Sequence, residues 1–208
     1  MQTFLDLNTA DSELLMSNEN SLAINLLKNK NKYSIIVGPE KSGKSILAKK
    51  FAKIYEAEVI NHIPRNLEFK NTMFLDLNEL PVNEEFFFHF LQKFISNDIG
   101  LTIFTTFNPH NSEIVSISLP DILSRLRSFN FASIANPQDE LLFALIKKFL
   151  MFKSISVPND IIKAVMTYIE RTYIDAFKAS ETINHLLYQN NHNINLSLIR
   201  QHYERIQR

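Results

Sequence analysis

Hydrophobic and polar positions follow one pattern before residue 136 and another after it. In the first part, short apolar and β-branched runs stand between helical stretches. These runs predict strands at residues 33–37, 58–60, 72–76, 101–106 and 129–134. After residue 136 the apolar positions recur with helical spacing throughout. The chain is therefore predicted to form an α/β domain with a parallel sheet flanked by helices, followed by a small all-α domain.

Helical spacing also places helices between and after these strands. Asn20 and Ser21 can cap a helix that runs to about residue 29. Asn83 opens another helix, whose apolar face carries four large side chains, Phe87, Phe90, Leu91 and Phe94. Further helices are predicted at residues 46–55 and 119–127, from residue 137 onward, and at residues 158–169, 175–188 and 196–206.

The segment after the first strand carries the most specific single motif of the first domain. Gly38 to Ser45 follow the pattern G-x-x-x-x-G-K-S of a phosphate-binding loop, with a strand before and a helix after. The chain has only three glycines, and two of them stand here. The alternative is a chance match in a loop before a helix. The residues predicted to bind a nucleotide are Gly38, Pro39, Glu40, Lys41, Ser42, Gly43, Lys44, Ser45 and Ile46.

This loop predicts ATP or ADP, with Mg²⁺, as the ligand. Backbone N–H groups at a helix N-terminus cradle phosphates, and the helix dipole favours their negative charge. Lys44 would reach the outer phosphates, and the Ser45 hydroxyl would hold Mg²⁺. Asp76, at the end of a predicted strand, would be a second magnesium ligand. The alternative for Asp76 is that it caps the following turn.

The residue after Asp76 limits what this site is expected to do with ATP. Many ATPases have a second carboxylate at that position, which activates the attacking water. This chain has Leu77 there, and Glu79 lies two positions further on. We therefore expect nucleotide binding with weak intrinsic ATPase activity.

Two candidate catalytic positions can each be interpreted in two ways from the sequence. Thr105 and Thr106 end a predicted strand and could sense the terminal phosphate or position a water, but β-branched residues are also ordinary strand composition. Arg125 and Arg127 lie in a short helix. Such an arginine could enter a neighbouring subunit's phosphate site as an arginine finger, or pair locally on the surface.

Residues 1–17 are expected to form an extended arm. Its apolar tail with a preceding glutamine could be an edge strand or a frayed terminus. It could also be a linear peptide that docks in a partner's groove. In the second interpretation the contacts come from Gln2, Phe4, Leu5 and Leu7.

Composition narrows the function classes. The chain has 208 residues, 45% of them hydrophobic and 21% charged, which suits one sizeable core with a small appended domain. A formal net charge of +0 does not favour a non-specific nucleic-acid binder. The lack of cysteine excludes disulfides and thiolate metal sites, and the six histidines show no metal-ligand spacing. No apolar run approaches the ~18 residues of a membrane span, so we expect a soluble cytoplasmic protein.

Taken together, these motifs resemble the DnaA-related branch of the AAA+ ATPases, and most closely the Hda-type proteins. Residues 38–45 match Walker A, residues 75–76 the end of the Walker B strand, and residues 84–89 (E-E-F-F-F-H) a stretch that follows it. Thr105 falls at the sensor 1 position. Residues 119–126 (L-P-D-I-L-S-R-L) are similar to the box that carries the trans-acting arginine, here Arg125. Residues 2–7 (Q-T-F-L-D-L) resemble the family's clamp-binding peptide.

The resemblance implies three parts: a clamp-binding arm at residues 1–17, an AAA+ P-loop domain at 18–135 and a helical lid at 136–208. It implies a regulator that docks on the polymerase sliding clamp and offers Arg125 to the ATP site of the initiator DnaA. The resemblance leaves a homodimer open and implies little or no direct DNA binding. In the lid region of the sensor 2 arginine, the chain offers Arg171 and Lys178.

Three other function classes compete with this interpretation. The first is a self-sufficient small AAA+ ATPase that acts in DNA replication or remodelling. The second is a nucleotide kinase on the same scaffold, although residues from 137 onward lack an arginine-rich lid. The third is an interaction protein whose phosphate loop binds no nucleotide.

Overall fold

The chain divides into two compact units at the link between Ala135 and Asn136. The computed structural model describes residues 14–63, 72–77, 83–111, 120–191 and 193–206. Within these ranges, no helix is long and apolar enough to cross a membrane. The two units are described separately below.

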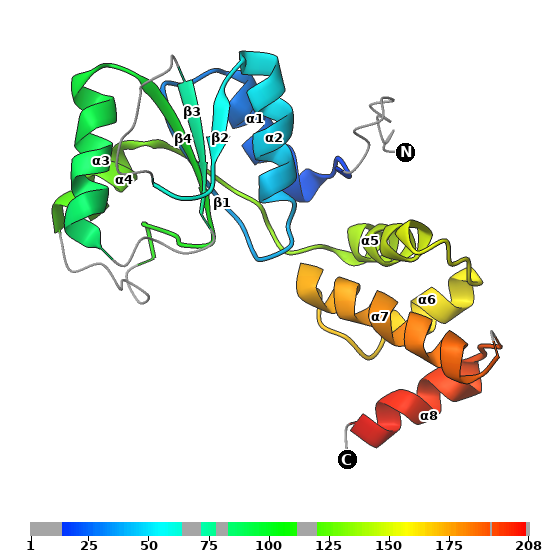
Figure 1. The fold of residues 1–208 in the computed structure, drawn as a ribbon. Helices are drawn as coiled ribbons and strands as arrows, with labels where there is room; N and C mark the ends of the chain where they lie inside the picture. The colour runs from blue at the N-terminus through cyan, green and yellow to red at the C-terminus, as the bar shows by residue number, and fades with distance from the viewer. Residues whose placement is uncertain (1–13, 64–71, 78–82, 112–119, 192, 207–208) are drawn as a thin grey trace. The chain divides into compact units, whose positions relative to one another are not determined.

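A five-stranded parallel sheet forms the centre of the first unit (Figure 1). Its strands follow the order β2-β3-β4-β1-β5, and every neighbouring pair runs parallel. The five strand predictions are confirmed, with ends that differ by one residue at most. The strands are β1 (Tyr33–Val37), β2 (Glu58–Ile60), β3 (Thr72–Asp76), β4 (Gly100–Thr105) and β5 (Asn130–Ser133).

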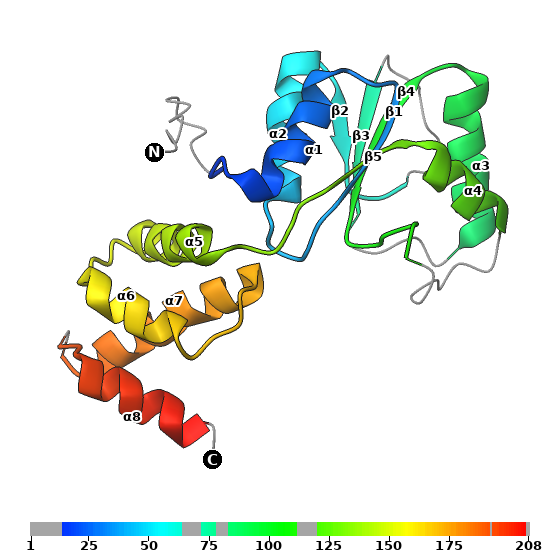
Figure 2. The same ribbon diagram turned by 180° about the vertical axis from the view of Figure 1, so that it is seen from behind.

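Helices cover both faces of this sheet, which explains why the strands are apolar runs rather than alternating ones. On one face lie α1 (Asn18–Lys28) and α2 (Lys44–Tyr55), and on the other lie α3 (Glu84–Ser96) and α4 (Pro120–Ser128), as both views show (Figures 1 and 2). The start of α3 is capped as predicted, since the Asn83 side-chain oxygen accepts a hydrogen bond from the Phe86 N–H at 2.9 Å.

The predicted cap of the first helix was wrong by a few residues. Helix α1 begins at Asn18, and Ser17 is its N-cap. Asn20 lies inside the first turn, where its side-chain oxygen accepts from the Ser17 N–H at 3.1 Å and its amide donates to the Leu15 carbonyl at 2.7 Å. Asparagine suits a helix start in either place, so the sequence alone did not fix the position.

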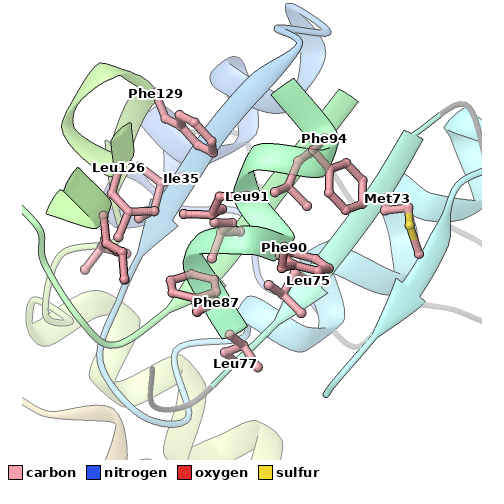
Figure 3. Close-up of a cluster of buried hydrophobic side chains, with 14 residues drawn as sticks. Ile35, Met73, Leu75, Leu77, Phe87, Phe90, Leu91, Phe94, Leu126 and Phe129 are labelled. Carbon is pink, nitrogen blue, oxygen red and sulfur yellow. The ribbon is translucent and has the colours of Figure 1, made fainter. Parts of the chain in front are cut away.

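The main core lies between the sheet and the α3–α4 layer (Figure 3). Successive strand residues point to opposite faces, so Met73, Leu75 and Leu77 share this face while Asp76 points the other way. Helix α3 contributes the four large side chains predicted for its apolar face, and all four are buried. Phe86 and Phe88 are only partly buried, so the helix has one fully buried side.

The second unit is entirely helical in its described residues, as the sequence predicts. Helix α5 packs against α6 and α7, and α6 packs against α8. The third predicted helix starts earlier than expected because Thr172 caps it, accepting from the Asp175 N–H at 3.0 Å. The second predicted helix ends at Met166, earlier than the expected residue 169. The four helices are α5 (Asp139–Phe152), α6 (Asn159–Met166), α7 (Tyr173–Gln189) and α8 (Leu196–Ile206).

Candidate nucleotide site

The predicted phosphate loop connects β1 to α2 at the carboxyl edge of the sheet. Its entry is fixed by the strands on either side of β1. The Gly38 N–H donates to the Thr105 carbonyl of β4 at 3.1 Å, and the Ile134 N–H, just beyond β5, donates to the Val37 carbonyl at 2.7 Å. This edge, where parallel strands end, is where α/β sheets commonly bind ligands.

The geometry of the loop favours glycine at both positions. A Cβ atom on Gly38 would lie 2.8 Å from the Ser42 hydroxyl and 3.0 Å from the Ile134 Cβ, so a side chain there would force its neighbours to shift. Gly43 is the N-cap of α2 and has a φ angle of +88°, in the left-handed region that favours glycine. The loop thus turns tightly into the N-terminus of α2, a favourable position for phosphate binding.

Lys44 is buried inside this loop, with 5% of its surface exposed. Its ammonium donates to the carbonyls of Gly38 and Pro39, both at 2.7 Å. Burial lowers the pKa of Lys44, while the Asp76 and Glu40 carboxylates act in the opposite direction. The ammonium is therefore held inside the loop, close enough to Asp76 for that carboxylate to affect its pKa.

Two buried polar atoms of the site have no hydrogen-bond partner among the described residues: the Ser42 Oγ and one oxygen of Asp76. Such atoms are rare, because leaving a buried polar group unsatisfied costs about 1–3 kcal/mol. A ligand or ion at this edge would satisfy them. Ser45 is exposed in the first turn of α2 and Ile46 is half-buried. Backbone amides, a lysine, two serines and a carboxylate are the donor set that a magnesium nucleotide needs.

No cluster of three or more histidine, cysteine or acidic side chains that could hold a metal lies in the described part of the chain. This agrees with the chemistry of magnesium in nucleotide sites. Mg²⁺ is usually held by one or two protein groups together with phosphate oxygens and water. Asp76 and Ser45 are the residues available for that role here.

Thr105 is the last residue of β4 and is fully buried next to the loop. Its hydroxyl accepts a hydrogen bond from the Phe107 N–H at 3.1 Å, and so stabilises the turn after the strand. Its carbonyl accepts the hydrogen bond from the Gly38 N–H. The structure thus brings Thr105 to the site through its backbone, and a role in sensing phosphate stays a prediction.

Arg125 is not brought to the loop. It lies on α4, in the helix layer on the opposite face of the sheet from α2 (Figures 1 and 2). Its guanidinium carbon is 4.8 Å from the centre of the Phe88 ring of α3. Arg127, two residues on, instead donates from its Nε to the Pro109 carbonyl at 2.7 Å. No spacing pattern in the sequence links Phe88 of α3 to Arg125 of α4.

Several predicted residues cannot be placed near this site. Gln2, Phe4, Leu5 and Leu7 lie outside the described residues, as does Glu79. Both sensor 2 candidates belong to the second unit. The Arg171 Nε pairs with Asp139 at 3.1 Å, and Lys178 is exposed.

A cavity of the first unit lies elsewhere. It has a volume of about 490 Å³ and lies at the amino edge of the sheet, where its lining includes Lys30, Ser34, Tyr55 and Thr102. No residue of the phosphate loop lines it. Phosphate loops bind their ligands on an open edge through backbone groups, so we place the candidate site by its chemistry rather than by cavity size.

Comparison with known proteins bears on the fold. No protein-family profile and no curated protein matches the sequence. Among solved structures, the chain is similar to the RuvB Holliday junction branch migration motor of Thermotoga maritima, with a TM-score of 0.61 and 17% identity over 97% of this chain and 73% of that one. It is also similar to domain III of the T. maritima replication initiation protein DnaA, with a TM-score of 0.66 and 13% identity over 91% and 92%.

A third similar structure is the replication initiator DnaA bound to AMPPCP and single-stranded DNA. Its TM-score is 0.63, at 14% identity over 91% of this chain and 70% of that one. Identities this low establish the fold alone. The parallel five-stranded sheet and its flanking helices have the fold of the AAA+ P-loop domains of RuvB and DnaA.

Proposed function

We propose that this chain is a nucleotide-binding AAA+ regulator of replication initiation that docks on the polymerase sliding clamp and stimulates ATP hydrolysis by DnaA. The observation that carries the proposal is the position of Arg125, on the face of the sheet opposite α2. An arginine there lies in the helix layer across the sheet from α2, whose N-terminus the phosphate loop enters. We therefore expect it to act on an ATP site of another molecule.

The nucleotide part of the proposal is supported by the geometry of the loop. Lys44 would bind the outer phosphates of ATP or ADP, exchanging its contacts with Gly38 and Pro39 for phosphate oxygens. Ser45 and Asp76 would hold Mg²⁺. A bound magnesium ion would neutralise phosphate charge. The buried oxygens of Ser42 and Asp76 give the protein unsatisfied polar atoms for these contacts.

The surroundings of Leu77 support weak turnover by this site. Leu77 is 7% exposed and packs in the α3 core, so the position after Asp76 offers an apolar side chain on the wrong face for activating water. The protein's own nucleotide would then stabilise an assembly-competent state of the chain instead of driving rapid hydrolysis. Calorimetric titration with ADP and ATP tests whether the chain binds a nucleotide, since an interaction protein with an empty phosphate loop would bind neither.

Arg125 would act in trans. In the site of DnaA its guanidinium would stabilise the charge that develops on the transferring phosphoryl group. Arginine fingers contribute about 10³–10⁵ in rate. We therefore expect Arg125→Ala to keep the fold and nucleotide binding but to lose nearly all stimulation of DnaA. Arg127→Ala, on the same helix, is the matched control and should retain it. Full stimulation by Arg125→Ala would refute the trans mechanism.

Clamp docking rests on the resemblance of residues 2–7 to a clamp-binding peptide. In such a peptide, Gln2 would be the polar contact and Phe4, Leu5 and Leu7 the apolar anchors. The double substitution Gln2→Ala, Leu5→Ala should abolish co-purification with the clamp, whereas Thr3→Ala should not. Undiminished clamp binding by the double variant would remove this assignment and leave the DnaA assignment standing.

The likeness to the RuvB branch migration motor favours one alternative, a self-sufficient ATPase that acts on DNA. That function requires turnover by the isolated protein. Steady-state hydrolysis at the rate of a motor, abolished by Asp76→Asn, would support the alternative. Hydrolysis that stays near background until DnaA is added would support the proposed regulator.

A further inference from the structure

We propose that Phe88 is a positioning residue for Arg125. In this role the ring holds the guanidinium in place without using its charge or its hydrogen-bond donors for a local ion pair. The inference rests on the proposed function of Arg125 and adds a determinant from a different helix. The contact itself lies within the first unit, between α3 and α4.

The Arg125 guanidinium lies over the Phe88 ring, and both helices are fixed in the core. The guanidinium carbon of Arg125 lies 4.8 Å from the centre of the Phe88 ring, within the distance of about 6 Å at which a cation is attracted to a ring face. Ile122 and Leu126, the neighbours of Arg125 on α4, are fully buried and fix the helix against the core. On the other side, Phe87 holds α3 in the same core. The backbone on both sides of the contact is therefore anchored.

The Nε atom of Arg125 is buried and has no partner among the described residues. In contrast, the Nε of Arg127 donates to the Pro109 carbonyl. A carboxylate partner would have neutralised Arg125 and used its donors. An aromatic face attracts the cation without doing either, so Arg125 keeps its capacity to bind an anion.

The ring also reduces the conformational freedom of the Arg125 side chain. Arginine has many rotamers, and fixing it in a partner's site costs conformational entropy at the moment of docking. A side chain already confined by a ring loses less of that entropy and reaches the productive geometry more often. Phe88 should therefore affect the maximal stimulated rate more than the affinity of docking.

The test compares three variants of the full chain in stimulation of DnaA. Phe88→Leu keeps an apolar side chain but removes the ring, Phe88→Tyr keeps the ring, and Phe86→Leu is the matched control from the same helix. Loss of a cation–ring attraction should lower the maximal stimulated rate by about two- to thirtyfold in Phe88→Leu. The concentration for half-maximal stimulation should change little. Phe88→Tyr and Phe86→Leu should behave like the wild type.

A second measurement does not depend on DnaA. The ring of Phe88 should shift the NMR resonance of the Arg125 Nε–H, and burial should slow its exchange with water. Both effects should vanish in Phe88→Leu and persist in Phe88→Tyr. If Phe88→Leu fails to fold, the positioning role is tested by the other two proteins. The Arg125 Nε–H resonance should then be shifted and protected from exchange in the wild type and in Phe88→Tyr.

The outcomes separate this inference from the proposed function. If Arg125→Ala retains full stimulation, the proposed function fails. If Arg125→Ala loses stimulation while Phe88→Leu keeps the wild-type maximal rate, the positioning role is overturned and the proposed function stands. An Arg125 Nε–H with ordinary shift and exchange in the wild type also overturns it.

Discussion

The side chain of Lys44 carries its charge where water is largely excluded. Burial lowers its pKa from the ordinary 10.5, so the unfolded chain binds this proton more tightly than the folded protein does. Between the lowered value and 10.5, the Lys44 contribution to stability therefore rises with pH. Bound phosphates act in the opposite direction, because negative charge beside the ammonium raises its pKa again.

From this follows a pH dependence of ADP binding. At pH 9.5 binding should take up protons and be weaker than at pH 7.5, since Lys44 is partly deprotonated before the ligand arrives. The terminal phosphate, with a pKa of about 6, is already largely ionised at both pH values. Calorimetry in buffers of different ionisation enthalpy measures the uptake. Lys49→Ala, which removes an exposed lysine of α2, should leave it unchanged. Equal affinity and no uptake at pH 9.5 would contradict the role of Lys44.

Leu77 is the second residue with a specific expected effect. Leu77→Ala should lower the free energy of unfolding by about 2–5 kcal/mol, because it opens a cavity in the α3 core. Leu77→Glu should be at least as destabilising and should not create an ATPase, because the carboxylate would enter that core. Denaturant unfolding measures both. Leu22→Ala, at a position that is 63% exposed, should change stability by no more than about 0.5 kcal/mol.

At the scale of single elements, the cap of α7 offers a direct test. Thr172 accepts from the Asp175 N–H at 3.0 Å and donates to the Asp175 carboxylate at 2.7 Å. Thr172→Ala should therefore destabilise the second unit by about 1 kcal/mol. Thr167→Ala, just after α6, is the control, since its exposed hydroxyl only donates to a carbonyl in the preceding turn. Equal effects of the two changes in thermal unfolding would argue against the cap.

The elements themselves could be predicted from the sequence because local signals determine them. The apolar run 33–37 and the stripe of Phe87, Phe90, Leu91 and Phe94 needed no tertiary information. The first residue of a helix was harder to predict where two nearby polar residues can both start a helix, as Ser17 and Asn20 can.

Contacts between distant elements could not be predicted. The residues of the phosphate loop could be predicted to lie together, because they are adjacent in sequence and belong to one motif. The meeting of Phe88 with Arg125 depends on how α3 and α4 pack, and no periodicity encodes that. The two contacts of Thr105 could not be predicted either. Its carbonyl accepts from the Gly38 N–H because β1 and β4 pair in this register, and its hydroxyl accepts from the Phe107 N–H in the following turn.

At the scale of the whole molecule, the division at Ala135 has a testable consequence. The second unit has its own buried side chains, among them Leu142, Ile146, Val165 and Ile183. Expressed alone, residues 136–208 should be helical and unfold cooperatively on heating. Circular dichroism measures both properties. A fragment without helical signal would show that this unit needs the first one to fold.

The strand order also imposes a sequence of events during synthesis. Strand β1 is made early, but its neighbours β4 and β5 are made much later. The nascent chain therefore carries the phosphate loop on the ribosome before Thr105 exists to hold Gly38, and before Ile134 exists to hold Val37. Since non-local pairing must precede the site, a nucleotide cannot assist early folding. It would act only on a completed first unit, and so would distinguish chains that contain β5 from chains truncated before it.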